Sequence, residues 1–379
     1  MMTRTVLIAA LLAASASAQK SAQDAAASPL KTQNRTPAAP VVRGLVESSV
    51  TEGDAHLRGF RFQTGETMPD LRIHYRTLGA PRRDASGVVR NSVLILHGTT
   101  GAGTTFLRDI FAGQLFEAGQ PLDTAKYYVI LPDGIGHGQS SKPSDGLRAK
   151  FPRYGYTDMV EAQYRMLSES LGVNHLRLVL GTSMGCMHAY VWMERHPDFL
   201  DAAVPLACQP MQITGRNLLW RLTVIHAIRD DPAWKGGDYT ENPPGARTAA
   251  AVMAFVGGNP ITWQKLSPTR EKGIENFGKI TGGHLPDAND TAYAVDASWD
   301  YDPAPGLAKI RTPILHINFS DDTINPPELN ITPDLLKQVP SAQFVLYPYT
   351  PETVGHGSHT KAALWKDKLA EFLRATEKQ

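Results

Sequence analysis

Six short, nearly continuous apolar runs most limit what this chain can fold into. Each run is five to seven residues long, the length of a strand rather than of a helix. Runs without regular polar alternation are typical of strands buried on both faces, as in a parallel sheet covered by helices. The runs are residues 92–96, 127–131, 176–180, 202–207, 313–319 and 343–347.

Helical patterns separate many of these runs. Residues 158–171, 184–196 and 360–376 carry apolar side chains near a period of 3.6. Two earlier segments, 57–62 and 71–78, alternate apolar and polar residues as half-buried strands do. The order of elements therefore predicts an α/β fold with a mostly parallel eight-stranded sheet and helices on both faces.

Residues 211–300 interrupt this rhythm. They contain several helical stretches and four of the tryptophans, but no clear buried strand. We interpret them as a helical cap inserted into one core, which would then consist of residues 51–210 and 301–379.

The first residues predict export. Arg4 is followed by the apolar run 6–14, which is too short to span a bilayer, and by an Ala-x-Ala site ending at Ala18. We therefore expect residues 1–18 to be a signal peptide cleaved after Ala18, and residues 19–50 to be a flexible tether. The mature protein is expected in the periplasm or outside the cell, without membrane association.

Charge and cysteine content exclude several classes of protein. The 38 basic and 37 acidic side chains give a net charge of +1, which offers no basic surface for nucleic acid. No zinc-ligand spacing is present, and neither a metal nor an organic cofactor is expected. The two cysteines, Cys186 and Cys208, follow adjacent predicted strands, and we expect two free buried thiols rather than a disulfide.

The motif Gly181-Thr182-Ser183-Met184-Gly185 predicts a nucleophile. It follows the predicted strand 176–180 directly and begins an apolar helix. A strand-to-helix turn this sharp needs residues without bulk at its first and fifth positions, and it exposes the serine above the sheet on a strained backbone. A plain tight turn with an incidental serine is the structural alternative.

A serine hydroxyl needs a base, and in this arrangement the partners follow in the order serine, acid, histidine. Asp321 and Asp322 follow the predicted strand 313–319, where the orienting acid belongs, and only one of them can face the histidine. His356, flanked by glycines before the last helix, is the expected base. His359 is the alternative, although it could also cap that helix or lie beside the site.

Two backbone amides are expected to form an oxyanion hole. One belongs to Met184, the residue after the serine, and the other to Thr99 in the glycine-rich loop 97–101. His97 is expected to brace that loop by hydrogen bonding rather than to take part in catalysis. Structural roles are also expected for Asp133, His137 and His188.

Over about residues 58–375 the chain resembles the homoserine O-acetyltransferase family within the α/β-hydrolase superfamily. The resemblance rests on residues 64–66 with 75–79, 97–101, 151–152 with 158–160, 183–185 and 231–239. It implies the α/β-hydrolase fold, acyl-enzyme chemistry and, as in related proteins, a homodimer formed through the cap. In similar enzymes the acid precedes a proline by four residues, which selects Asp322 and leaves Asp321 as a solvated or turn-capping neighbour.

Departures from the family favour a hydrolase. Where the family's acetyltransferases tend to carry a cap arginine for the amino acid carboxylate, this chain has Ile225, with Arg221 one turn earlier. Residues 136–143 read like the loop of a general hydrolase, and Cys186 replaces a glycine. An exported protein would also lack acetyl-CoA, a cytoplasmic metabolite. We therefore expect an exported serine hydrolase acting on esters of small or medium acyl groups. An acetyl-CoA-dependent acyltransferase and a non-catalytic relative are the alternatives.

Overall fold

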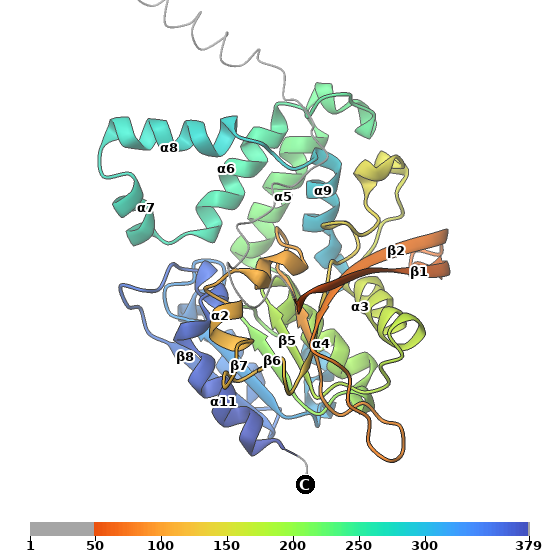
Figure 1. The fold of residues 1–379 in the computed structure, drawn as a ribbon. Helices are drawn as coiled ribbons and strands as arrows, with labels where there is room; N and C mark the ends of the chain where they lie inside the picture. Colours follow the sequence, from red (N-terminus) through yellow and green to blue (C-terminus); the bar gives the residue numbers. More distant parts are fainter. Residues whose placement is uncertain (1–48, 378–379) are drawn as a thin grey trace, which may run out of the picture.

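The structure is a computed structural model that describes residues 49–377, so the predicted signal peptide and nearly all of the predicted tether lie outside the described residues. Its centre is one eight-stranded sheet in the order β1-β2-β4-β3-β5-β6-β7-β8 (Figure 1). The strands are β1 (Thr51–Arg61), β2 (Thr67–Leu78), β3 (Ser92–Leu96), β4 (Tyr128–Pro132), β5 (Leu178–Thr182), β6 (Ala203–Leu206), β7 (Ile314–Phe319) and β8 (Ala342–Tyr347).

The sheet is mostly parallel, as predicted. β1 and β2 form an antiparallel pair, and β2 joins β4 antiparallel at the edge of the parallel part. All other neighbouring strands, from β4 through β8, run parallel. The loops that carry Ser183, Asp322 and His356 follow β5, β7 and β8. They therefore lie together at the carboxyl ends of parallel strands.

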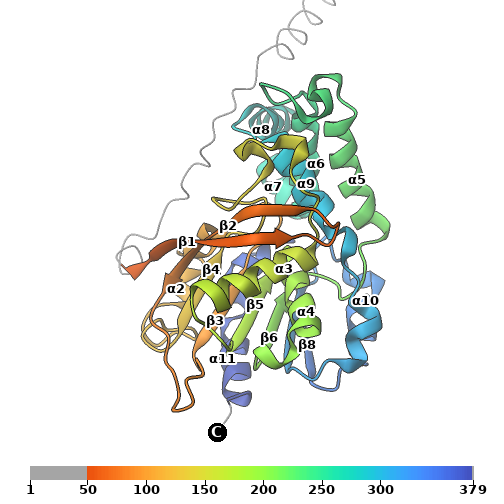
Figure 2. The same cartoon turned by 90° about the vertical axis from the view of Figure 1, so that its right-hand side faces the viewer.

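Helices cover both faces of the sheet, which explains the continuous apolar runs. Leu94 and Leu96 of β3 belong to the core beneath α3 (Tyr156–Arg165) and α4 (Met184–Arg195). The intervening side chains of the same strand point to the opposite core, which α2 (Ala112–Leu115) and α11 (Lys366–Ala375) close. Figure 2 shows α3 and α4 together on one side of the strands.

The last helix is shorter than the predicted 360–376. Residues Gly357–Thr360 and Ala362–Leu364 form 3-10 turns, and α11 begins only at Lys366. The amide of Ala362 donates to the carbonyl of Ile110 at 3.1 Å, so it cannot continue an α-helical ladder there. This contact fixes the segment just after His356 against the core.

Between β6 and β7 the chain leaves the sheet and forms a helical cap (Figure 1). The cap has its own apolar core, in which side chains of α5 (Gly215–Arg229), α6 (Gly245–Gly257) and α9 (Ala288–Asp296) meet. α7 (Pro260–Leu266) and α8 (Arg270–Gly282) lie beside α6, on the side away from α9 (Figure 1). Outside the cap, α10 (Ile331–Leu336) lies between β7 and β8 in the sequence. Within residues 49–377, no helix has the length and apolar character needed to cross a membrane.

Candidate active site

The turn between β5 and α4 holds Ser183 in a strained conformation. Its φ of 54° and ψ of −110° lie outside the regions that L-residues favour. A Cβ at Gly181 would lie 1.9 Å from the carbonyl oxygen of Gly185, and a Cβ at Gly185 would lie 2.1 Å from that of Leu96. Only glycine therefore fits at both positions, which is the physical reason for the motif read from the sequence.

Ser183, His356 and Asp322 form a chain of short contacts in which His356 lies between the other two side chains. The Nε2 atom of His356 is 2.7 Å from Ser183 Oγ, and its Nδ1 atom is 2.8 Å from Asp322 Oδ2. Asp322 is 1% exposed and His356 is 8% exposed, whereas Ser183 is partly open to solvent. The three side chains come from the loops after β5, β7 and β8.

Hydrogen bonds keep the buried carboxylate of Asp322 ionised. Its Oδ1 accepts from the amides of Ile324 at 2.8 Å and Asn325 at 3.2 Å. Its Oδ2 accepts from the Asn325 side chain at 3.0 Å as well as facing His356. Burial alone would raise the pKa of Asp322, but the charge and hydrogen bond of His356 and these donors outweigh it and lower the pKa below its usual value.

Asp321 does not face the histidine, and the expectation that it is a solvated or turn-capping residue was wrong. Its Oδ2 accepts three hydrogen bonds, from the side chains of Asn259 and Thr353 and from the amide of Gly355. All three donors come from distant parts of the chain rather than from its own turn. The adjacent aspartates therefore point to different partners, and only Asp322 contacts His356.

His359 lies beside His356 and does not contact Ser183. The two imidazole rings meet edge to face at 5.1 Å between centroids. Burial, followed by the nearby charge of His356, lowers the pKa of His359 to about 3, so its ring is neutral at ordinary pH. Of the alternatives considered from the sequence, His356 is the histidine that the structure brings to the serine.

The two amides expected in the oxyanion hole border the serine. Met184 opens helix α4, where the first amides have no partner inside the helix. Thr99 follows Gly98, at which a Cβ would lie only 3.3 Å from Ser183 Cβ. Within the described chain, neither amide donates to a protein acceptor. Both are therefore free to bind an oxygen placed next to Ser183.

Histidines brace the loop that carries Thr99. His97 Nδ1 donates to the carbonyl of Gly98 at 2.8 Å, and its Nε2 accepts from the amide of Gly134 at 2.9 Å. Burial and the neighbouring His137 lower the pKa of His97 to about 4. His137 lies between the carbonyls of Ile135 and Thr99, at 2.8 and 2.9 Å. These contacts agree with the structural roles expected for both residues.

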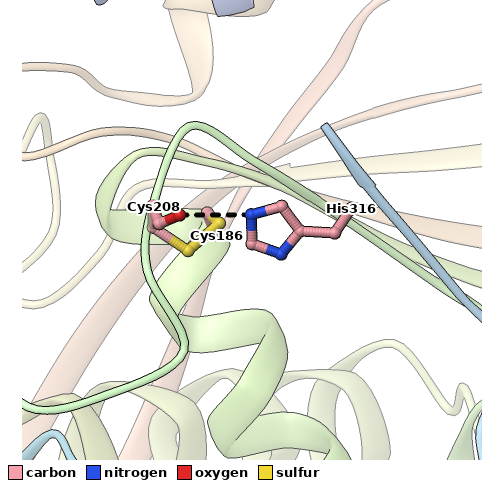
Figure 3. Close-up of side chains that lie close together, drawn as sticks. All are labelled: Cys186, Cys208 and His316. Atoms are coloured by element: carbon pink, nitrogen blue, oxygen red, sulfur yellow. Dashed lines mark hydrogen bonds between the residues drawn. A yellow bond between two sulfur atoms is a disulfide. The ribbon is translucent and has the colours of Figure 1, made fainter. Parts of the chain in front are cut away.

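The cysteines form a disulfide, so the expectation of two free thiols was wrong. Cys186 at the start of α4 is bonded to Cys208 just after β6, with 5.9 Å between their Cα atoms (Figure 3). Neighbouring parallel strands bring the two chain segments to the spacing that a disulfide needs, which sequence separation alone does not reveal. His316 lies against this bond, with Nε2 3.1 Å from the Cys208 carbonyl.

Cys186, Cys208 and His316 are the one group in residues 49–377 whose ligand atoms lie close enough for a metal ion. Both sulfur atoms are joined to each other, so neither is the thiolate that a metal ligand requires. The cluster is therefore a disulfide with a packed histidine.

Sequence reasoning missed one residue beside the site. Asn325 is 4% exposed, and its Nδ2 donates both to Asp322 Oδ2 and to the carbonyl of Ala207, each at 3.0 Å. It therefore ties the acid loop to the end of β6. The only sequence signal is an asparagine close after an aspartate, a pair that commonly forms local side-chain to backbone bonds.

Comparisons with known proteins agree with this architecture. The family described as the alpha/beta hydrolase fold matches residues 91–354. A probable acyltransferase of Methanothermobacter thermautotrophicus is 30% identical over 322 residues, which cover 83% of this chain and 95% of that protein. The chain belongs to the α/β-hydrolase fold family, in its homoserine O-acetyltransferase-like branch.

Solved structures share the fold. A homoserine O-acetyltransferase from Bacillus anthracis superposes with a TM-score of 0.74 at 24% identity, covering 86% of this chain and 98% of that one. An acetylester hydrolase from Corynebacterium glutamicum gives a TM-score of 0.73 at 21% identity, covering 86% and 96%. The family membership and the similarity to the probable acyltransferase make the protein an enzyme of the hydrolase or acyltransferase type.

Proposed function

We propose that the protein is an exported hydrolase that cleaves carboxylic esters of small or medium acyl groups through an acyl-enzyme on Ser183. The observation that carries this proposal is the chain of short contacts from Ser183 through His356 to Asp322, at 2.7 and 2.8 Å. A serine joined in this way to a base and an orienting acid is the arrangement that activates a hydroxyl nucleophile.

The geometry suggests each step. His356 Nε2 takes the proton of Ser183 as Oγ attacks the ester carbonyl, and Asp322 holds the imidazole by its Nδ1–H. The amides of Thr99 and Met184 bind the oxygen that becomes negative, an interaction worth about 2.7–4 kcal/mol per donor. His356 then protonates the departing alcohol. Water, deprotonated by the same histidine, releases the acid and restores the serine.

The surroundings of Arg221 favour hydrolysis over transfer to an amino acid. The resemblance assigns an arginine to a substrate carboxylate, at a position where this chain has the buried Ile225. The nearby Arg221 is occupied, because its Nε donates to Asn217 Oδ1 at 3.0 Å and its Nη1 to the Val295 carbonyl at 3.2 Å. These contacts of Arg221 therefore tie its guanidinium to the cap itself.

The disulfide supports the proposed export. Disulfides persist in oxidising compartments and are rare in the cytoplasm. Cys186 and Cys208 are bonded in the structure, which fits a protein that leaves the cytoplasm behind the signal predicted for residues 1–18. Cell fractionation and N-terminal sequencing test this directly, and a cytoplasmic protein that retains Met1 would contradict it.

An acetyl-CoA-dependent acyltransferase is the second candidate. It is favoured by the similarity to the probable acyltransferase, which extends over most of both chains. Transfer and hydrolysis share the acyl-enzyme, and they differ only in whether an alcohol or water removes the acyl group.

A paired assay separates the two functions. Protein beginning at Gln19 and its Ser183→Ala variant are given a series of p-nitrophenyl esters of increasing acyl length, or acetyl-CoA with L-homoserine. We expect ester turnover that the variant lacks, and no homoserine-dependent release of CoA. Homoserine-dependent CoA release would establish the transferase instead. Equal ester turnover by the variant would refute the role of Ser183.

A further inference from the structure

The residue next to the proposed acid has a distinct arrangement of contacts. Asp321 Oδ2 accepts from Asn259 Nδ2 at 2.6 Å, from Thr353 Oγ1 at 2.9 Å and from the amide of Gly355 at 2.8 Å. Hydrogen bonds to a carboxylate are roughly twice as strong as those between neutral groups. One oxygen atom therefore holds three segments of the chain together next to the active site.

Two of these donors belong to the loop that carries the proposed base. Gly355 immediately precedes His356, and Thr353 lies two residues further back and is 5% exposed. Holding the amide of Gly355 fixes the backbone from which the imidazole of His356 extends. Asp321 thus acts on the position of His356 without touching its ring.

The third donor belongs to the cap. We define the cap corner as residues 256–259, where α6 ends and α7 begins. Asn259 is 2% exposed, and its Oδ1 caps α7 by accepting from the amide of Thr262 at 2.6 Å. The same side chain therefore starts helix α7 with its oxygen and binds Asp321 with its nitrogen.

The cap corner also packs directly against the histidine loop. Gly355 has a φ of +68°, and a Cβ there would lie 3.0 Å from the amide nitrogen of Asn259. A side chain larger than hydrogen would separate the two segments. Close packing and the Asp321 bonds thus act at the same point, between the cap and the residue before His356.

We propose that Asp321 is a positioning residue that locks the cap corner to the loop of the general base, so that the cap sets where His356 stands relative to Ser183. The inference rests on the proposed function, because it assigns His356 the role of base. The two adjacent aspartates then have different roles. Asp322 orients the imidazole ring, and Asp321 holds the loop and the cap around it.

The test uses the rate at which a small fluorophosphonate modifies Ser183. This rate reports activation of the serine by His356 and needs little substrate binding. Mass spectrometry confirms the labelled residue, while kcat and KM for p-nitrophenyl acetate and the melting temperature are measured in parallel. The variants are Asp321→Asn, Asp321→Ala, Asn259→Ala and the double variant Asn259→Ala/Asp321→Ala in otherwise full-length mature protein.

Thr323→Val is the matched control. The Thr323 hydroxyl also binds the cap corner, through the carbonyls of Val256 at 3.0 Å and Gly258 at 3.2 Å, but it has no bond to the histidine loop. Its loss weakens docking of the cap and leaves the Asp321 contacts intact. We expect Thr323→Val to be labelled within about twofold of the wild-type rate.

We expect Asp321→Ala to lower the labelling rate and kcat by about tenfold to a hundredfold with KM within about twofold, since small misplacements of reacting groups cost rates of this order. Asp321→Asn, which keeps a neutral acceptor of the same shape, should recover part of the loss. Asn259→Ala should also slow labelling, and the double variant should be no slower than Asp321→Ala, because both changes break one linkage.

Two results would overturn the inference. One is wild-type labelling in folded Asp321→Asn and Asn259→Ala. The other is a loss that adds up in the double variant or appears equally in Thr323→Val. Failure of the proposed function gives a different result, because the wild type itself would then not be labelled at Ser183. That result would also overturn the inference. A labelled wild type that hydrolyses no ester would contradict only the substrate class.

Discussion

Removing the Cys186–Cys208 disulfide is the change whose effect on stability can be worked out most directly. The bond closes a loop with a sequence separation of 22. The loop-entropy relation assigns a crosslink of this length about 3 kcal/mol, through restriction of the unfolded chain. For a chain of 379 residues, with an unfolding entropy of about 2.1 cal/mol/K per residue, this corresponds to a fall of about 4 °C in melting temperature.

The assay is urea unfolding of Cys186→Ala/Cys208→Ala and of wild type, followed by tryptophan fluorescence. Wild type unfolded in the presence of dithiothreitol is the matched control, because it loses the crosslink but keeps both sulfur atoms in the core. We expect the reduced wild type to lose about 3 kcal/mol and the variant to lose somewhat more, since alanine leaves small cavities. An unchanged free energy of unfolding in both would refute the entropic account. So would a loss seen only in the variant.

Three further changes test other parts of the structure. Gly185→Ala should abolish activity and lower the melting temperature, because the new Cβ would lie 2.1 Å from the carbonyl oxygen of Leu96; a folded, active variant would contradict this packing. Burial, followed by the charge of Asp287, raises the pKa of Asp290 to about 7. The folded protein then keeps a proton that the unfolded chain releases near pH 4, so stability falls as the pH rises between these values. The free energy of unfolding of Asp290→Asn minus that of wild type, measured with urea, should therefore be more favourable at pH 8 than at pH 5. An equal difference at the two pH values would refute this reasoning. Finally, we expect a dimer formed through the cap. Leu219 on α5 is 64% exposed, and Leu219→Glu should reduce the mass seen by light scattering from that of two chains to that of one; a monomeric wild type would contradict the dimer.

The sheet could be predicted because burial on both faces leaves a clear pattern in the sequence. Residues 92–96 were predicted as a strand and form β3 with the same bounds. β5 was placed at 176–180 but spans Leu178–Thr182, because it continues into the turn before Ser183, where glycine and threonine do not look like a buried strand. The parallel direction of β3 to β8 followed from the alternation of strands and helices, whereas their order in the sheet was not predicted.

The site was predictable only where chain order constrains it. The serine motif and the order of acid and base pointed to three residues that the structure does bring together, and their catalytic roles stay predictions. The contacts of Asp321 could not be predicted, because Asn259 lies 62 positions away in the cap. The disulfide was misjudged for the same reason, since the distance between Cys186 and Cys208 depends on the packing of β5 beside β6.

Because the cap lies between β6 and β7 in the chain, the parts of the candidate site are synthesised at different times. Ser183 precedes His356 by 173 positions, with the whole cap between them. A nascent chain therefore contains Ser183, the proposed nucleophile, long before His356, the proposed base, is made, and the contact between them forms only after β7 and β8 have been synthesised. A chain that stops before residue 356 lacks the proposed base, and we expect it to be inactive. On the proposed mechanism, completion of the sheet is the step that brings the base to the serine.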